Sequence, residues 1–304
     1  MMDSDTTRNQ EPGTENQELG TMNYMTKLTR PTSLCIVHSA LCIALALAAA
    51  SANAAPPQLQ WCIERTEARE FTGKDGGVFH YRVAEKKDPE GRKVPLVILM
   101  HGAGERGTDN TRQLYHGAYD MLKWLDEHEA GFRFVAGQVP PNQQWVNVPW
   151  ESKSHDMPAQ PSKSMALQLE LLDALLADPA IDLDRVYVTG ISMGGYGAWD
   201  ILCRRPEVFA AVLPVCGGCD VAQAPRIAHV AVWAFHGSAD GTVPVFRARS
   251  IMSALWAQGS DAHYREYPDV GHNVWTPTYR DATVLEWFFR QRRKDSGPAS
   301  PARP

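Results

Sequence analysis

The chain has 304 residues, of which 44% are hydrophobic and 21% are charged. This length and composition suit one large globular domain with a buried core. The formal net charge of -5 is small for a chain of this size. It excludes the strongly basic surface that nucleic acid or an anionic membrane would require. We therefore expect no nucleic-acid partner.

The first 54 residues are expected to lie outside the folded domain. Residues 1–24 are polar and lack apolar periodicity, so we expect them to be disordered. Lys27 and Arg30 then precede an apolar run from Leu34 to Ala50, followed by small residues. This order predicts a secretory signal peptide cleaved after Ala54, and hence a secreted or periplasmic protein. The alternative, a transmembrane anchor, is disfavoured because a run of about 17 residues is short for a span.

The stretch from Arg185 to Asp200 combines a short apolar strand, a Gly-x-Ser-x-Gly turn and a helix-like run. This is the sequence form of a nucleophile elbow, in which a serine sits on a sharp turn between strand and helix. Gly190 and Gly194 fit the pattern because side chains beside the serine would clash with neighbouring backbone. We interpret Ser192 as a nucleophile. The alternative is an ordinary strand-to-helix turn.

A glycine-rich loop follows Val94–Met100, a continuous apolar run typical of a strand buried on both faces. The N–H groups of such a loop supply one oxyanion donor in a serine hydrolase, and the residue after the nucleophile supplies the other. We predict that these donors are Ala103 and Met193, with Gly104 as the alternative to Ala103. His101 opens the loop, and we expect it to pack the loop rather than act as a base.

Two later segments supply an acid and a base. Asp240 lies in a turn after an apolar strand, and His272 lies in a loop after the last predicted strand. The order Ser192, Asp240, His272 is that of α/β-hydrolases, and not that of chymotrypsin or subtilisin. We predict that His272 takes the proton of Ser192 and gives it to the leaving group, while Asp240 fixes the tautomer of His272. Asp269 is the alternative acid.

The order of the predicted strands and helices indicates an α/β-hydrolase fold, with a mostly parallel central sheet and helices on both faces. Residues 57–92 look like an opening antiparallel part of this sheet. Met165–Leu176 has apolar residues at helical spacing, and Thr283–Arg290 forms the closing helix. The catalytic domain is expected to span residues 55–291, with a disordered tail at 292–304. The short intervals between the predicted catalytic residues leave no room for a large lid domain.

A long proline-rich segment, residues 138–161, contains Trp145, Trp150 and His155. Loops of this length are often functional, and we expect this one to overhang the predicted nucleophile. Trp150 and Trp275 are predicted to contact substrate. The alternative for Trp150 is that it only packs the loop onto the body of the protein.

Four cysteines follow residue 54, namely Cys62, Cys203, Cys216 and Cys219. An oxidising compartment allows disulfides, but spacing does not define their connectivity. Cys216-Gly-Gly-Cys219 lacks the second pair that would complete a zinc site. We therefore expect no metal, and either a local loop disulfide or buried thiols.

Several of these motifs together resemble those of secreted bacterial α/β-hydrolase esterases. They are His101-Gly-Ala-Gly-Glu-Arg-Gly, Gly190-Ile-Ser-Met-Gly-Gly, His236-Gly-Ser-Ala-Asp240 with Val243-Pro244, and Gly271-His272. The family is the feruloyl-esterase-like and polyhydroxybutyrate-depolymerase-like group, often labelled phospholipase/carboxylesterase or prolyl-oligopeptidase-like. The resemblance covers roughly Phe71 to Arg290.

This resemblance implies a serine carboxylic-ester hydrolase that forms an acyl-enzyme and uses no cofactor. Its substrate would be a small-molecule or polysaccharide-linked ester, such as a feruloyl ester. The alternatives are a serine peptidase of the prolyl-oligopeptidase-like type and a non-enzymatic binding protein of the same fold.

Overall fold

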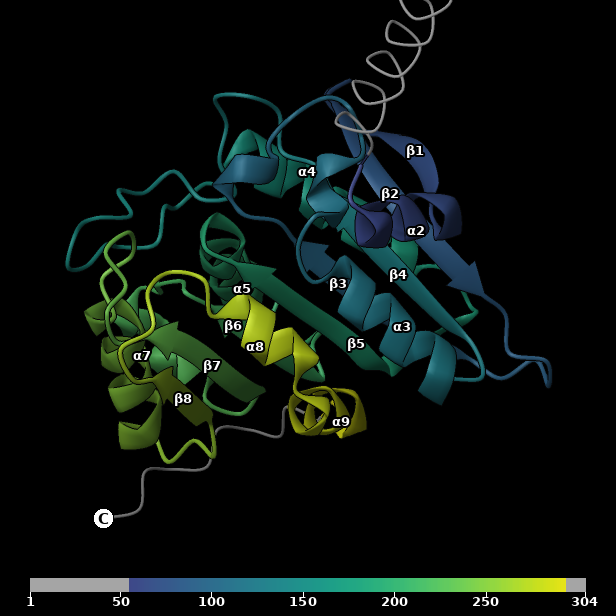
Figure 1. Cartoon of the computed structure of the whole chain (residues 1–304). Helices are drawn as coiled ribbons and strands as arrows, with labels where there is room; N and C mark the ends of the chain where they lie inside the picture. The colour runs from purple at the N-terminus through teal and green to yellow at the C-terminus, as the bar shows by residue number, and fades with distance from the viewer. Residues whose placement is uncertain (1–54, 294–304) are drawn as a thin grey trace, which may run out of the picture. The chain divides into compact units, whose positions relative to one another are not determined.

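An eight-stranded sheet forms the centre of the computed structural model, which describes residues 55–293 (Figure 1). The strand order is β1-β2-β4-β3-β5-β6-β7-β8. β2 pairs antiparallel with both β1 and β4, and every pair from β4–β3 to β7–β8 is parallel. The predicted α/β-hydrolase sheet is confirmed. The strands span Glu67–Thr72 (β1), Val78–Lys86 (β2), Val94–Met100 (β3), Phe132–Gly137 (β4), Ile181–Ile191 (β5), Ala211–Val215 (β6), Ala231–Gly237 (β7) and His263–Tyr267 (β8).

Helices cover both faces of the sheet because neighbouring strand residues point to opposite sides. Leu96 and Ile98 of β3 face one core cluster, which also contains residues of α4, α5, α6 and α7. Val97 and Leu99 face a second cluster, with α2, α3, α8 and α9. The α-helices span Pro57–Arg65 (α2), Ala118–His128 (α3), Lys163–Leu176 (α4), Met193–Arg204 (α5), Ala224–Ile227 (α6), Phe246–Ala257 (α7), Trp275–Arg280 (α8) and Ala282–Arg290 (α9). Short 3-10 turns lie at Ala103–Glu105 (η1), Arg112–Leu114 (η2) and Val221–Gln223 (η3).

The start of the folded part differs from the prediction. Residues 57–65 form α2, and the antiparallel part of the sheet begins only at β1. Pro57 stands in the first turn of α2, where its fixed φ favours a helix and its missing N–H costs nothing. This helix is only nine residues long, and only Leu59 and Cys62 of it are buried.

The predicted signal peptide, its cleavage site after Ala54 and the tail from residue 294 onward lie outside the described residues. Among residues 55–293, no helix combines the length and the apolar character needed to cross a membrane. Nor does this range contain a separate lid domain, because the segments between its strands are helices and loops.

The turn between β5 and α5 packs against the ends of two other strands. Ser192 has φ 53° and ψ -118°, a strained conformation for a residue with a side chain. A Cβ on Gly194 would lie well inside 3.0 Å of the Met100 carbonyl oxygen, at the end of β3. A Cβ on Gly195 would overlap the carbonyl oxygen of Val215, at the end of β6. Backbone contact at this turn therefore requires glycine.

Gly194→Ala tests this constraint. The added methyl group has no space, and overpacking typically costs about 1–3 kcal/mol. For a domain of this size we expect a melting temperature about 2–12 °C lower, measured by differential scanning calorimetry. Gly241→Ala is the matched control, because nothing lies within 4 Å of the added atom and φ is not positive. Equal melting temperatures for the two variants would contradict the steric account.

Candidate active site

A continuous hydrogen-bonded chain links Ser192, His272 and Asp240. Nε2 of His272 lies 2.8 Å from Oγ of Ser192, and Nδ1 of His272 lies 2.7 Å from Oδ2 of Asp240. Ser192 follows β5, Asp240 follows β7 and His272 follows β8. The carboxyl ends of parallel strands meet at one edge of a sheet, which is how residues far apart in the chain come together. This geometry allows His272 to accept the hydroxyl proton of Ser192.

Asp240 is held as a buried carboxylate. Its side chain is 0% exposed. Oδ1 accepts the backbone N–H groups of Thr242 at 2.8 Å and Val243 at 2.9 Å. Burial by itself raises the pKa of the Asp240 carboxyl. The hydrogen bonds from His236, His272 and these two N–H groups outweigh burial and hold that pKa below its usual range.

His236 is a second histidine beside the same carboxylate, and the sequence motifs do not predict a role for it. Its Nε2 lies 3.3 Å from Oδ2 of Asp240 and 2.9 Å from the carbonyl oxygen of Val243. The ring is fully buried at the end of β7. A proton on Nε2 can therefore be shared between Asp240 and the turn that follows it. His236 is the first residue of the His-Gly-Ser-Ala-Asp motif, so its position four residues before Asp240 was the available signal.

The predicted oxyanion donors each begin a helical turn at the same edge of the sheet. Ala103 is the first residue of η1, and Met193 is the first residue of α5. The N–H groups of first-turn residues have no acceptor within their own helix, so they are free for an anion. Gly104, the alternative donor, is the second residue of η1 and shares this property. The oxyanion hole at Ala103 and Met193 stays a prediction.

The two alternative candidates for the base and the acid, His101 and Asp269, do not join the hydrogen-bonded chain of Ser192, His272 and Asp240. His101 is buried, and its Nε2 accepts the N–H of Val139 at 2.9 Å. Burial lowers the pKa of His101 to about 4, so this ring is neutral near pH 7. Asp269 lies on the His272 loop with φ 57°, and its N–H donates to Oγ of Ser238 at 2.8 Å. The geometry therefore favours Asp240 as the acid.

The three tryptophans near the site differ in their surroundings. Trp145 is fully buried, and its Nε1 donates to the His101 carbonyl oxygen at 3.1 Å. Trp150 is half-buried, and its carbonyl oxygen accepts the hydroxyl of Tyr196 at 3.0 Å, one helical turn from Ser192. Trp275 opens α8 and meets the His272 ring edge to face, with centroids 5.4 Å apart. Trp275 therefore lies directly against the predicted base.

Polar contacts fasten the long loop between β4 and α4, which extends across to α7 (Figure 1). Nη1 of Arg247, on α7, donates to the Ser152 carbonyl oxygen at 2.8 Å, and Nη2 contacts His155. Nη2 of Arg204 donates to the Pro158 carbonyl oxygen at 2.9 Å. Arg247 is 2% exposed. The sequence does not predict this burial, because no motif includes this arginine.

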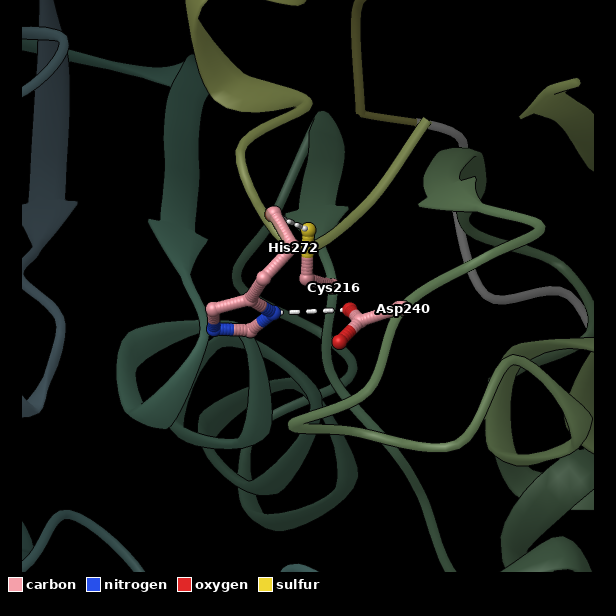
Figure 2. Close-up of side chains that lie close together, drawn as sticks. All are labelled: Cys216, Asp240 and His272. Atoms are coloured by element: carbon pink, nitrogen blue, oxygen red, sulfur yellow. Dashed lines mark hydrogen bonds and ion pairs between the residues drawn. The ribbon is translucent and has the colours of Figure 1, made fainter. Parts of the chain in front are cut away.

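Cys216 lies directly beside the acid and the base, as Figure 2 shows. Its thiol donates to the carbonyl oxygen of His272 at 3.1 Å. Its backbone has φ 50°, which is unusual for a residue with a side chain. The sequence predicted either a local loop disulfide or a buried thiol here, and in the structure Cys216 is a free, buried thiol. The structure shows that it connects the end of β6 to the His272 loop.

Cys216, Asp240 and His272 also place three possible metal ligands within 4.8 Å of one another. Burial, and next the charge of Asp240, raise the pKa of the Cys216 thiol. A metal ligand must be a thiolate, whereas this thiol is kept protonated and donates a hydrogen bond. Nδ1 of His272 is also engaged, with Asp240. The three groups fit a hydrogen-bonded chain better than a metal site.

The strand order and the position of this site define an α/β-hydrolase. The sequence profile of the phospholipase/carboxylesterase family matches residues 80–284, more than half of the chain. The chain therefore belongs to this family, which confirms the resemblance drawn from the motifs.

Solved structures agree with this assignment. A thermostable esterase is 35% identical, with a TM-score of 0.71 over 77% of this chain and 64% of that one. A ferulic acid esterase has a TM-score of 0.55 over 74% of this chain and 96% of that one. At 18% identity it shows the shared fold alone.

Curated relatives include depolymerases of polyesters. A poly(3-hydroxyoctanoate) depolymerase of Pseudomonas fluorescens is 25% identical over 84% of this chain and 97% of its own length. A protein of Nocardia uniformis subsp. tsuyamanensis named as an esterase is 25% identical over 70% of this chain, which spans 57% of that relative. The chain spans 28% of a poly(3-hydroxyalkanoate) depolymerase of Paucimonas lemoignei.

Asp240→Asn tests the buried carboxylate. A neutral amide neither fixes the tautomer of His272 nor stabilises its imidazolium as a carboxylate does. We therefore expect kcat to fall about 10⁴-fold, as for this change in other triads. The folded-state pKa of Asp240 is depressed. The ionised group therefore stabilises the fold above about pH 4, and this contribution is lost as pH falls through the folded pKa. Urea unfolding measures this effect. The difference in the free energy of unfolding between wild type and Asp240→Asn should be smaller at pH 3 than at pH 7.

Asp269→Asn is the matched control, since asparagine also tolerates a positive φ. It should keep near wild-type kcat, because Asp269 does not contact His272. A destabilisation by Asp240→Asn that grows as pH falls would contradict the assigned direction of the pKa shift.

Cys216→Ala and Cys216→Ser test the thiol beside His272. Loss of one hydrogen bond worth about 0.5–1.5 kcal/mol should lower kcat roughly 2- to 10-fold in the alanine variant, with KM unchanged. The serine hydroxyl can donate to the same carbonyl oxygen, so Cys216→Ser should recover most of kcat. Steady-state kinetics on one ester measure both. Equal kcat in the two variants would show that the hydrogen bond does not position His272.

Proposed function

We propose that the protein is a serine carboxylic-ester hydrolase that works through an acyl-enzyme. The single observation that carries the proposal is the chain from Ser192 through His272 to Asp240, with its two bonds of 2.8 and 2.7 Å. Membership of the phospholipase/carboxylesterase family supports ester chemistry. The 35% identical thermostable esterase supports the same reaction class.

In the first half of the reaction, Oγ of Ser192 attacks the ester carbonyl carbon while Nε2 of His272 takes the hydroxyl proton. The carbonyl oxygen becomes an oxyanion, which the N–H groups of Ala103 and Met193 would stabilise. Removal of one such donor typically costs about 3 kcal/mol of barrier. His272 then gives its proton to the departing alcohol, and the acyl group remains on Ser192.

In the second half, a water molecule attacks the acyl-enzyme and gives its proton to Nε2 of His272. Collapse of the second oxyanion returns the proton to Ser192 and releases the carboxylic acid. The ionised Asp240 stabilises the imidazolium in both halves. Its dense set of hydrogen bonds keeps the carboxylate charged and in place.

For substrate we propose an ester attached to a bulky group or polymer, such as an acyl or feruloyl ester of a polysaccharide, met outside the cell after export. Two features support an open site. Residues 55–293 include no lid domain over Ser192, and the serine itself is not fully buried. We propose Trp275 as one substrate contact because its ring lies against His272. Trp150 is the other, on the fastened loop beside the first turn of α5.

Ser192→Ala, with an ester panel, tests the proposal. The variant lacks the nucleophile, so kcat for p-nitrophenyl acetate should fall by roughly 10⁴- to 10⁶-fold, while the melting temperature stays near wild type. The wild-type chain is then compared on p-nitrophenyl acetate, methyl ferulate and a proline-containing peptide amide.

Faster turnover of the esters than of the amide is the expected result. A preference for the peptide amide would indicate a serine peptidase instead. Full ester turnover by Ser192→Ala would contradict the proposal that Ser192 is the nucleophile.

A further inference from the structure

Two buried cysteines meet at the end of the helix that follows the predicted nucleophile. Sγ of Cys203 lies 3.6 Å from Sγ of Cys219. Cys203 is in the last turn of α5, and Cys219 lies in the loop after β6. They are 1% and 6% exposed, and both are free thiols in this structure. Two side chains from different elements therefore point at one another in the core.

We propose that Cys203 and Cys219 form a disulfide that cross-links α5 to the loop after β6. A disulfide places its sulfur atoms about 2.05 Å apart, so these atoms must approach by roughly 1.5 Å. Rotation about the two Cα–Cβ bonds is the movement that shortens this distance. Cys216 is no competitor, because its thiol is directed at the His272 carbonyl oxygen.

The oxidant is a small or protein disulfide, such as oxidised glutathione. The thiolate of one cysteine attacks a sulfur atom of the oxidant, which forms a mixed disulfide and releases one reduced thiol. The second cysteine then attacks its partner's sulfur, the Cys203–Cys219 bond forms and the second thiol leaves. Two electrons pass to the oxidant, and its two thiols take up the two protons that the cysteines lose.

The burial of the pair indicates when the cross-link closes. Burial, together with the neighbouring Cys203, raises the pKa of the Cys219 thiol well above its usual value. The thiolate is the attacking species, so the folded, reduced protein should react slowly. The bond should therefore form during folding, before the two side chains are enclosed.

The cross-link has a structural consequence for the long loop beside the site. Arg204, next to Cys203, donates to the Pro158 carbonyl oxygen. Asp220, next to Cys219, accepts the N–H of Met157 at 3.0 Å. The two residues that hold this part of the loop are thus neighbours of the two cysteines. A disulfide would limit the distance between Arg204 and Asp220. This effect does not depend on which reaction the site performs.

The experiment uses the full chain, unfolded under reducing conditions and refolded with either oxidised and reduced glutathione or excess reductant. Free thiols are then alkylated with iodoacetamide, and a non-reducing digest is analysed by mass spectrometry. We expect a linked Cys203–Cys219 peptide, two hydrogen masses lighter than its parts, only after oxidative refolding. A loop of this length should raise the melting temperature of the oxidised form by roughly 6–12 °C.

Two variants separate this bond from other thiol effects. Cys203→Ala should melt at the same temperature with and without reductant, whereas Cys62→Ala should keep the wild-type difference. Should Cys203→Ala fail to fold, the peptide map of the wild-type chain decides by itself. Alkylation of both cysteines after oxidative refolding, or a link of either one to any of the other four cysteines of the chain, would overturn the proposal.

Discussion

The structure around the site depends on a close backbone contact between the first turn of α5 and the ends of β3 and β6. Gly194 lies against the carbonyl oxygen of Met100, and Gly195 against that of Val215. A side chain at either position would move the helix away from the sheet. The helix would then carry Ser192 and the N–H of Met193 away from the loop that opens at His101. One steric requirement thus sets both the strained serine and the place of the predicted oxyanion donors.

A buried charge is the second constraint, and it acts through Asp240. Removing a carboxylate from water costs free energy unless its oxygen atoms accept hydrogen bonds. The turn after β7 supplies two backbone donors, and His236 and His272 supply ring nitrogens within 3.3 Å. The same bonds that offset desolvation also orient His272 toward Ser192. The electrostatic stability of the loop and the geometry of the proposed mechanism therefore have one physical origin.

The periphery of the site is held by polar contacts that cross between elements. Arg247 reaches from α7 to the Ser152 carbonyl oxygen, and Arg204 reaches from α5 to that of Pro158. Cys216 connects β6 to the loop of His272. Arg204, Cys216 and Arg247 follow three different strands of the same sheet. The long loop and the loop of His272 are therefore both held by residues that this sheet positions. If Trp150 contacts substrate as proposed, changes in its loop should alter the shape of the substrate cleft more than the hydrogen bonds that link Ser192, His272 and Asp240.

The sequence by itself determined the sheet type, and it predicted the turn at Ser192 and the order of serine, acid and base. These are local signals, because an apolar run, a glycine pattern and a turn residue each report on a few neighbouring positions. It missed α2, a helix of nine residues with only two buried side chains. Only the tertiary structure decided that Asp240 and not Asp269 meets His272, that His236 and Cys216 join that cluster, and that Cys203 meets Cys219. Each of these depends on which strand ends lie side by side, and that follows from the packing of the whole sheet, not from any single stretch of the chain.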